Sequence, residues 1–533
     1  MAKNFDFYKN KSFRWSFVSM TLILLVVVFW SLDKGIVMLD EAFYMLHFQE
    51  GAYPIATSNW LQLAKPFYDG NLIHLRLLIF LSILLSSFSM GFVMSSFFKF
   101  DWPPFFTGML TVFFQFVLAM PVQYVPNNAT INLILINLSL LFFFSAFLAK
   151  DRRVFQFGFL FLSGLCLGFV PFAMITNLPL LGLFGITIIL IYQKNRFLTP
   201  FLFWILGLAS SVSIYFLFLQ DWNEFLIKFK EAVEFGSFMS SHGIKPLLKW
   251  HYQLFVQFAG IPLALAILNV IMANNPLKEY FSQQIIKILT GVLVLFLVVS
   301  EVFSPFGVFS TTLFYSLLFS LLWIGKAHFL PWKQEYWVLV LLLLIPYAAA
   351  LGTDVPFQIR SVTYFPITFL LLIILIKKIE IRYFNLYFFS LAIVLFLNFL
   401  TYPMRDGWAR HKLVEQTIEY ELPHGQGKMK LDKDIIDALE FLKPHVSPND
   451  KVIISSANQW GLVYLLGAQM PVLAFWRNEA YTLHFLKDKN INKTDLILLE
   501  GKYNPFSEKF KNEFFEGKEM KTIKTGDFTL YRF

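Results

Sequence analysis

Apolar runs long enough to cross a lipid bilayer recur along most of this chain. A helix rises about 1.5 Å per residue, so about 20 apolar residues cross a hydrocarbon core about 30 Å thick. We count about 13 such runs. They cover residues 16–32, 72–98, 104–122, 129–148, 154–173, 177–192, 198–219, 252–273, 285–303, 308–324, 335–351, 363–378 and 382–400. The sequence therefore predicts a polytopic α-helical membrane protein.

The composition agrees with a membrane location. Hydrophobic residues make up 57% and charged residues 15% of the chain, against about 45–50% and about 25% in soluble domains. The net charge of +9 comes from short basic clusters between apolar runs, which is typical of topology signals and not of a nucleic-acid surface. We therefore expect no nucleic-acid partner. Cys166 is the single cysteine, so no intrachain disulfide is expected.

Basic residues set the expected orientation, because Lys and Arg accumulate in the cytoplasmic loops of membrane proteins. With the N-terminus inside, the inside loops include the basic clusters at 150–153 and 377–382. The short outside loops around 126–128 and 304–305 carry no basic residue. An odd number of spans then places residues after about 401 outside the cytoplasm.

The last part of the chain has the composition of a soluble domain. The stretch 401–430 is rich in proline and glycine and is expected to be a linker. Within 431–533, helical spacing of apolar residues at 432–442 and 460–466 alternates with strand-like runs at 451–455, 495–499 and 528–532. We expect a small extracytoplasmic α/β domain. It has no glycine-rich phosphate fingerprint, so it is expected to dock substrate or stabilise the fold.

An acidic pair, Asp40 and Glu41, opens the first outside loop, 33–71. The apolar residues that follow, 42–48, predict an amphipathic helix on the membrane surface that would hold the acids at a fixed depth. A carboxylate there can deprotonate an incoming hydroxyl or amine. We expect Asp40 to be the base and Glu41 to orient it, the alternative being a solvated start of a loop.

Basic residues on the same side are candidates for holding a phosphate. His74 and Arg76 begin the second span, about one turn inside the hydrocarbon boundary, and Arg360 lies in a later outside loop. A guanidinium matches the oxygens of a phosphate, although each arginine could equally be an interfacial anchor. The chain has no DxD motif and no His/Cys cluster with zinc spacing. We expect no metal ligand and no required cofactor, and leave a divalent metal open.

Short motifs in the first loop resemble those of a known family. The sequence LDEAFY at 39–44 resembles the DE-x-x-Y stretch of glycosyltransferase family 39, and GAYP at 51–54 resembles the turn that follows it. With about 13 spans and an outside tail, the layout resembles the GT-C class of membrane glycosyltransferases. Family 39 includes protein O-mannosyltransferases and lipid A aminoarabinose transferases.

The resemblance implies a bacterial inner-membrane enzyme that uses a polyprenyl-phosphate sugar donor. It carries catalytic roles onto Asp40 and Glu41 and substrate-binding roles onto Tyr44, His74, Arg76 and Arg360. An inverting transfer to a lipid, glycan or protein acceptor is expected, mannosyltransferase-like in type. Many relatives have another acid in the second outside loop, whereas 121–128 has none.

Two other functions fit the same layout. One is a transporter or flippase of lipid-linked sugars, although such proteins usually bury charges at mid-membrane. The other is a scaffold that has kept the fold without catalysis. The sequence leaves the sugar, the acceptor and the oligomeric state open.

Overall fold

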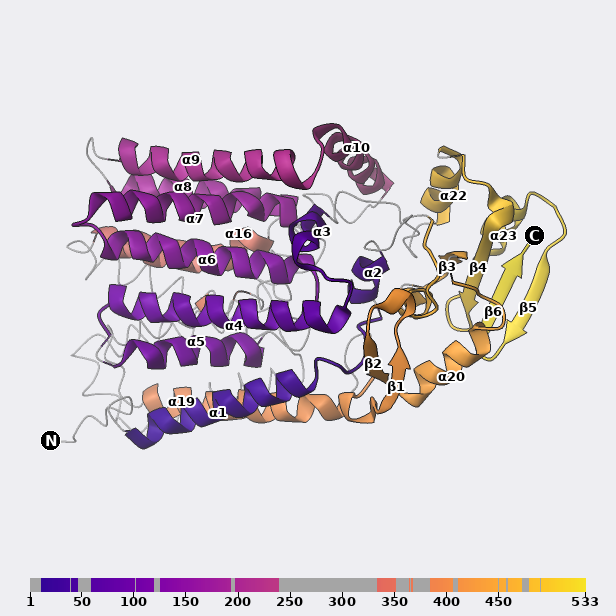
Figure 1. Cartoon of the computed structure of the whole chain (residues 1–533), viewed down its shortest axis with the longest axis horizontal. Helices are drawn as coiled ribbons and strands as arrows, with labels where there is room; N and C mark the ends of the chain where they lie inside the picture. Colours follow the sequence, from indigo (N-terminus) through magenta and orange to yellow (C-terminus); the bar gives the residue numbers. More distant parts are fainter. Residues whose placement is uncertain are drawn as a thin grey trace, which may run out of the picture.

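The computed structural model describes residues 11–38, 40–46, 59–100, 102–118, 125–192, 197–238, 333–350, 364, 366–367, 384–405, 411–448, 450–456, 459–471, 479–488 and 490–533. These residues form a layered array of long helices and a smaller α/β domain that covers one end of it (Figure 1). We call that end of the helices the domain end. The chain is thus a helical membrane protein with a C-terminal α/β domain.

The long helices follow the apolar runs of the sequence. They are α1 (Lys11–Trp30), α4 (Leu72–Phe97), α5 (Pro104–Leu118), α6 (Asn128–Leu148), α7 (Arg153–Ala173), α8 (Leu178–Ile191), α9 (Leu198–Ile214), α16 (Lys333–Ala350) and α19 (Phe384–Thr401). Shorter elements are α2 (Asp40–Leu46), α3 (Asn59–Ala64), η3 (Lys65–Phe67), η5 (Ile175–Asn177), η6 (Tyr215–Leu219) and α10 (Trp222–Phe238).

Five helices among the described residues are long and apolar enough to cross a membrane. They are α1, α4, α6, α7 and the segment 198–219, and each coincides with a span expected from the sequence. The expected spans 252–273, 285–303 and 308–324 lie outside the described residues, and so does nearly all of 363–378. The expected total of about 13 spans therefore stays a prediction.

Side-chain contacts between neighbours give the relative directions of α4, α6 and α7. Asn137 Nδ2 on α6 donates to Ser87 Oγ on α4 at 3.1 Å, and Phe144 of α6 meets Phe97 of α4 with ring centroids 5.1 Å apart. The second contact lies closer to the C-terminus than the first on both helices, so α4 and α6 are parallel. Ser139 Oγ donates to Ser163 O at 3.0 Å across the short connection to α7, which runs back. The start of α6 and the end of α7 therefore both lie at the domain end.

Glycines allow α7 and α9 to approach closely, as small residues do between membrane helices. A Cβ added to Gly164 on α7 would fall on the backbone carbonyl of Trp204 on α9. At Gly158, six residues earlier on α7, a Cβ would meet nothing within 4 Å among the described residues. Gly164 thus packs directly against α9, whereas Gly158 on the same helix does not.

Gly164→Val is expected to destabilise the protein by about 1–3 kcal/mol, because the added methyl groups force the two helices apart. Gly158→Val is the matched control, since it makes the same change on the same helix in open space. Thermal unfolding of both variants in one detergent measures the difference. Equal unfolding midpoints would show that α7 and α9 are not in close contact.

The C-terminal domain contains two sheets. A hairpin of β1 (Ile418–Glu421) and β2 (Lys428–Leu431) is followed by a four-stranded sheet in the order β3-β4-β6-β5. β3 (Lys451–Ile454) pairs parallel with β4 (Leu496–Gly501), and β6 (Phe528–Arg532) pairs antiparallel with β4 and β5 (Lys521–Thr525). The helices are α20 (Lys433–Leu442), α21 (Trp460–Leu465), α22 (Glu479–Asp488) and α23 (Glu508–Phe515).

The elements expected in 431–533 are present as α20, β3, α21, β4 and β6. The stretch 401–430 differs from the linker expected there, because β1 and most of β2 lie within it. The boundary expected at 430 thus falls inside β2. β5, α22 and α23 were not anticipated.

Candidate functional site

The first loop turns back after α1 and runs alongside β2 of the C-terminal domain. Gly35 N donates to Lys430 O at 2.8 Å, and Lys430 N donates to Asp33 O at 2.7 Å. The Lys430 ammonium also pairs with the Asp33 carboxylate at 2.6 Å. Gly35 has a φ of +56°, a conformation that glycine adopts without steric cost. Residues 33–35 thus join the hairpin through an isolated parallel β-bridge between Lys34 and Lys430.

Lys34 adds a further contact between the loop and the domain. Its Nζ donates to Gln416 O at 3.1 Å and lies 4.4 Å from the centroid of the Trp30 ring. Burial lowers the pKa of Lys34 below its usual value. The loop is therefore held from the domain side by both backbone and side-chain bonds.

A buried ion pair between Glu41 and Arg76 holds the other side of the loop. Arg76 Nη2 lies 2.6 Å from Glu41 Oε2, Arg76 Nε donates to Glu41 Oε1 at 2.7 Å, and both side chains are 0% exposed. Arg76 also donates to the carbonyls of Leu32 and Gly35, each at 2.7 Å. Val37 N donates to Glu41 Oε2 at 2.9 Å. One guanidinium on α4 thus joins the end of α1, the loop and the start of α2.

These contacts change the role expected for Arg76. Its guanidinium is directed at protein partners and is fully buried, so in this structure it is not presented to a phosphate. Glu41 is the partner that orients it, and the pair fixes the backbone at the first turn of α2. Asp40 is the first residue of α2, while its side chain lies outside the described part of the structure.

Helix α2 lies between the helical array and the C-terminal domain (Figure 1). Ala42, Phe43, Met45 and Leu46 are all buried, and Phe43 meets Trp460 of α21 with ring centroids 4.5 Å apart. The expectation that this helix lies on the membrane surface is wrong, because α21 covers the apolar face that a membrane would have covered.

Tyr44 on α2 is half-buried. Its ring contacts Phe43 with centroids 5.4 Å apart and packs against Ala64 of α3 and Ala173 of α7. Tyr44 therefore lies where α2, α3 and α7 meet, at the domain end. The substrate-binding role expected for it stays a prediction.

His74 lies in the first turn of α4, a helix long and apolar enough to span a membrane. Its side chain is 62% exposed, and its Nδ1 is 2.6 Å from Asp69 Oδ2. This hydrogen bond, together with the one from Asn71 N, holds the pKa of Asp69 below its usual value. Asn71 caps the helix by accepting from Ile73 N and His74 N. Arg360, the other expected phosphate ligand, lies outside the described residues.

The C-terminal domain also holds the start of α4. Leu72 N donates to Gln426 O at 3.1 Å, and the hydroxyl of Tyr464 on α21 donates to Gln426 Oε1. Burial, with Tyr68 and Glu41 nearby, raises the pKa of Tyr464 well above its usual value, so the hydroxyl stays a donor. No motif marks Gln426, Lys430 or Tyr464, and sequence reasoning did not find them.

Three buried amides lie at the domain end of the helical array. Asn132 lies one turn into α6, Asn177 ends η5 after α7, and Gln220 follows η6 at the end of α9. All are at most 4% exposed. Among the described residues, both amide atoms of Asn132 and of Asn177 and the Nε2 of Gln220 have no hydrogen-bond partner. A buried amide in this state costs about 1–3 kcal/mol, so a polar ligand or water is expected there.

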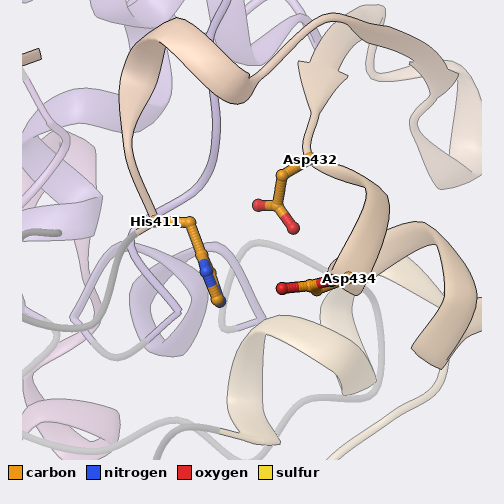
Figure 2. Close-up of side chains that lie close together, drawn as sticks. All are labelled: His411, Asp432 and Asp434. Atoms are coloured by element: carbon orange, nitrogen blue, oxygen red, sulfur yellow. The ribbon is translucent and has the colours of Figure 1, made fainter. Parts of the chain in front are cut away.

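His411, Asp432 and Asp434 form a cluster that could hold a metal ion (Figure 2). One potential ligand atom from each lies within 4.8 Å of the others. Asp432 also caps α20, since its Oδ1 accepts from Ile435 N at 2.9 Å. Sequence reasoning missed this cluster because the histidine and the two acids are far apart in the chain.

Comparison with known proteins gives one match in structure. No protein-family model matches the chain, and no curated protein matches it. The chain is similar to a solved structure described as the crystal structure of ArnT from Cupriavidus metallidurans bound to undecaprenyl phosphate. The likeness covers 96% of this chain and 97% of that chain, with 10% sequence identity and a TM-score of 0.37. Similarity at this level carries no functional conclusion.

Proposed function

We propose that this protein is a membrane glycosyltransferase that moves a sugar from a polyprenyl-phosphate donor to an acceptor outside the cytoplasm. The observation that carries the proposal is the buried Glu41–Arg76 pair, which fixes the loop and the first turn of α2 where the acidic pair stands. A buried ion pair is costly to assemble and is a weak source of stability. The presence of the pair in this loop is consistent with a loop that must keep one conformation to position the acids.

In the proposed reaction Asp40 is the general base. Its carboxylate takes the proton of the acceptor's hydroxyl or amine while the acceptor atom attacks the anomeric carbon of the sugar. The bond between that carbon and the phosphate oxygen breaks, its electron pair leaves with the polyprenyl phosphate, and the configuration inverts. Polyprenyl phosphate is a good leaving group, so base positioning and charge stabilisation supply the catalysis.

Glu41 and Arg76 are positioning residues in this mechanism, since they act through the loop. Arg360 and the exposed His74 are then the candidates for contacting the leaving phosphate. Tyr44, at the junction of α2, α3 and α7, is proposed to contact the substrate. In this proposal the domain end opens on the extracytoplasmic side of a bacterial inner membrane, with the N-terminus inside.

The buried amides at the domain end are proposed to bind the hydroxyl groups of a sugar. An amide offers both a donor and an acceptor, as a sugar hydroxyl does. Asn132 and Asn177 have both amide atoms available among the described residues. Carbohydrate is therefore a better match for these residues than an apolar ligand.

Asn132→Leu is expected to raise stability by about 1–3 kcal/mol, because it removes a buried amide without a partner. The same change is expected to lower transfer, because the sugar loses a hydrogen-bonding partner. Asn137→Leu, one and a half turns further along α6, is the comparison. Asn137 Nδ2 donates to Ser87 while its Oδ1 has no partner among the described residues, so its loss is expected to bring less gain in stability. Unfolding midpoints and transfer rates separate the two effects. If Asn132→Leu is more stable and transfers sugar at the wild-type rate, the sugar does not bind at Asn132.

The function itself is tested by mass spectrometry of cell-envelope glycoconjugates from cells with and without the gene. The expected result is one glycan that loses a sugar, which returns on expression of the wild type but not of Asp40→Asn. Identical glycoconjugates in all of these cells would contradict the proposal.

A further inference from the structure

We propose that His411, Asp432 and Asp434 bind a divalent transition-metal ion at the start of α20. The ion would join the segment that precedes β1 to the first turn of α20. The site lies in the C-terminal domain, next to the first loop, and it is separate from the groups proposed to act on the sugar.

The geometry of the three side chains suits one ion. In Figure 2 the His411 ring and the carboxylates of Asp432 and Asp434 face a common space, and their ligand atoms lie within 4.8 Å of one another. Ligand atoms opposite each other on an ion with bonds of about 2.1 Å stand about 4.2 Å apart. Small rotations of the exposed His411 and Asp434 therefore complete the coordination.

The charges of the cluster also call for a cation. Two carboxylates stand close together, and among the described residues no lysine or arginine forms an ion pair with either of them. The positive end of the α20 dipole offsets part of their repulsion. A divalent ion would balance the two negative charges.

Gln416 borders the cluster on its buried side. Its side chain is 0% exposed, and its Nε2 donates to Asp432 Oδ2 at 3.1 Å. Its Oε1 has no partner among the described residues. A 180° rotation of the side-chain amide would exchange Nε2 and Oε1. It would place an oxygen about 3 Å from Asp432 Oδ2, which is the spacing of neighbouring oxygen ligands on one ion. Gln416 can thus serve as a fourth ligand.

The donor set indicates the class of metal. One imidazole nitrogen with carboxylate and amide oxygens favours Mn²⁺, Fe²⁺ or Zn²⁺ over Mg²⁺ or Ca²⁺, which prefer oxygen alone. His411 and Asp434 are exposed, so the remaining positions of the ion are open to water.

Binding would reach the first loop through Gln416. The Gln416 carbonyl accepts from Lys34 Nζ at 3.1 Å, and its amide fills the space beside Gly35, where an added Cβ would lie 3.1 Å from Gln416 Oε1. Fixing Gln416 to an ion would therefore stiffen the side of the loop that faces the domain. The ion is structural in this proposal and takes part in no chemical step.

The test uses the full-length protein in detergent, stripped with EDTA and titrated with Mn²⁺. The electron paramagnetic resonance signal of free Mn²⁺ is lost on binding, so it reports the dissociation constant directly. We expect one site per chain, weakened at least about tenfold in His411→Ala and in Asp434→Asn. Zn²⁺ is expected to displace the Mn²⁺, in keeping with the usual order of affinities.

Glu440→Gln is the matched control, because it removes one exposed acid from the same helix and is expected to bind Mn²⁺ like the wild type. Both test residues are exposed, so the variants are expected to keep the wild-type unfolding midpoint in EDTA. The proposal is overturned if the wild type leaves the Mn²⁺ signal unchanged, or if His411→Ala and Asp434→Asn bind as the wild type does. The readout needs no glycosyl transfer, so it stands apart from the proposed function.

Discussion

Arg76→Met is expected to destabilise the protein by about 3–5 kcal/mol, because it leaves the Glu41 carboxylate buried without its charge partner. Glu41 is 0% exposed and, among the described residues, keeps the bond from Val37 N alone. The carbonyls of Leu32 and Gly35 lose their donors at the same time. Chemical unfolding of the purified protein in detergent measures this loss.

His74→Gln is the control for this experiment, since it alters the same helix two residues earlier. Its pair with Asp69 is exposed, and exposed pairs add little to stability. The free energy of unfolding of His74→Gln is therefore expected to stay close to that of the wild type. A value for Arg76→Met that matches the control would show that the buried pair does not form.

Removing both members of the pair separates stability from positioning. In Glu41→Leu/Arg76→Met no buried charge is left, so the double variant is expected to be more stable than either single variant. Transfer is expected to stay low in it, because the bonds that shape the loop are gone. Wild-type transfer in the double variant would contradict the positioning role.

Asp40→Asn is expected to lower glycosyl transfer by about 100-fold to 10,000-fold, the usual contribution of a general base. An amide cannot accept the proton of the acceptor. Asp40 is the first residue of α2, where an acid gains only about 0.3–1 kcal/mol from the helix dipole, so the unfolding midpoint is expected to stay close to that of the wild type. The measurement is single-turnover transfer from a polyprenyl-phosphate sugar to the acceptor identified by mass spectrometry.

Asp221→Asn is the matched control for the base. Asp221 is an exposed acid just before α10, and its Oδ1 caps that helix by accepting from Asn223 N. Asn caps as well as Asp, so transfer and stability are both expected to be unchanged. A wild-type rate in Asp40→Asn would remove the proposed mechanism, whereas equal losses in both variants would indicate a general effect of acid removal.

Much of the fold follows from local patterns. The long helices were predictable because each apolar run has the length that a bilayer requires. The strands β3 and β4 were predictable because 452–454 is a run of β-branched apolar residues and 496–499 is a short apolar run. β1 and β2 were missed because charged residues alternate with their apolar ones and because they lie in a stretch rich in proline and glycine.

The site was less predictable, because its contacts join distant parts of the chain. The motif at 39–44 marked the acids, but it could not show that Glu41 pairs with Arg76 or that Phe43 packs on Trp460. Residues 42–46 are apolar in a pattern that fits a membrane surface as well as a protein partner. Only the position of α21 decides between the two.

The most direct test of the account is whether position 40 and the C-terminal domain face the same compartment outside the cytoplasm. Asp40→Cys and Lys502→Cys, each in a Cys166→Ala background, are exposed in intact cells to a maleimide that does not cross membranes. Lys502 is exposed on the C-terminal domain and reports the side of that domain. We expect both cysteines to react from outside the cell. Reaction at position 40 only after the inner membrane is opened would contradict the account.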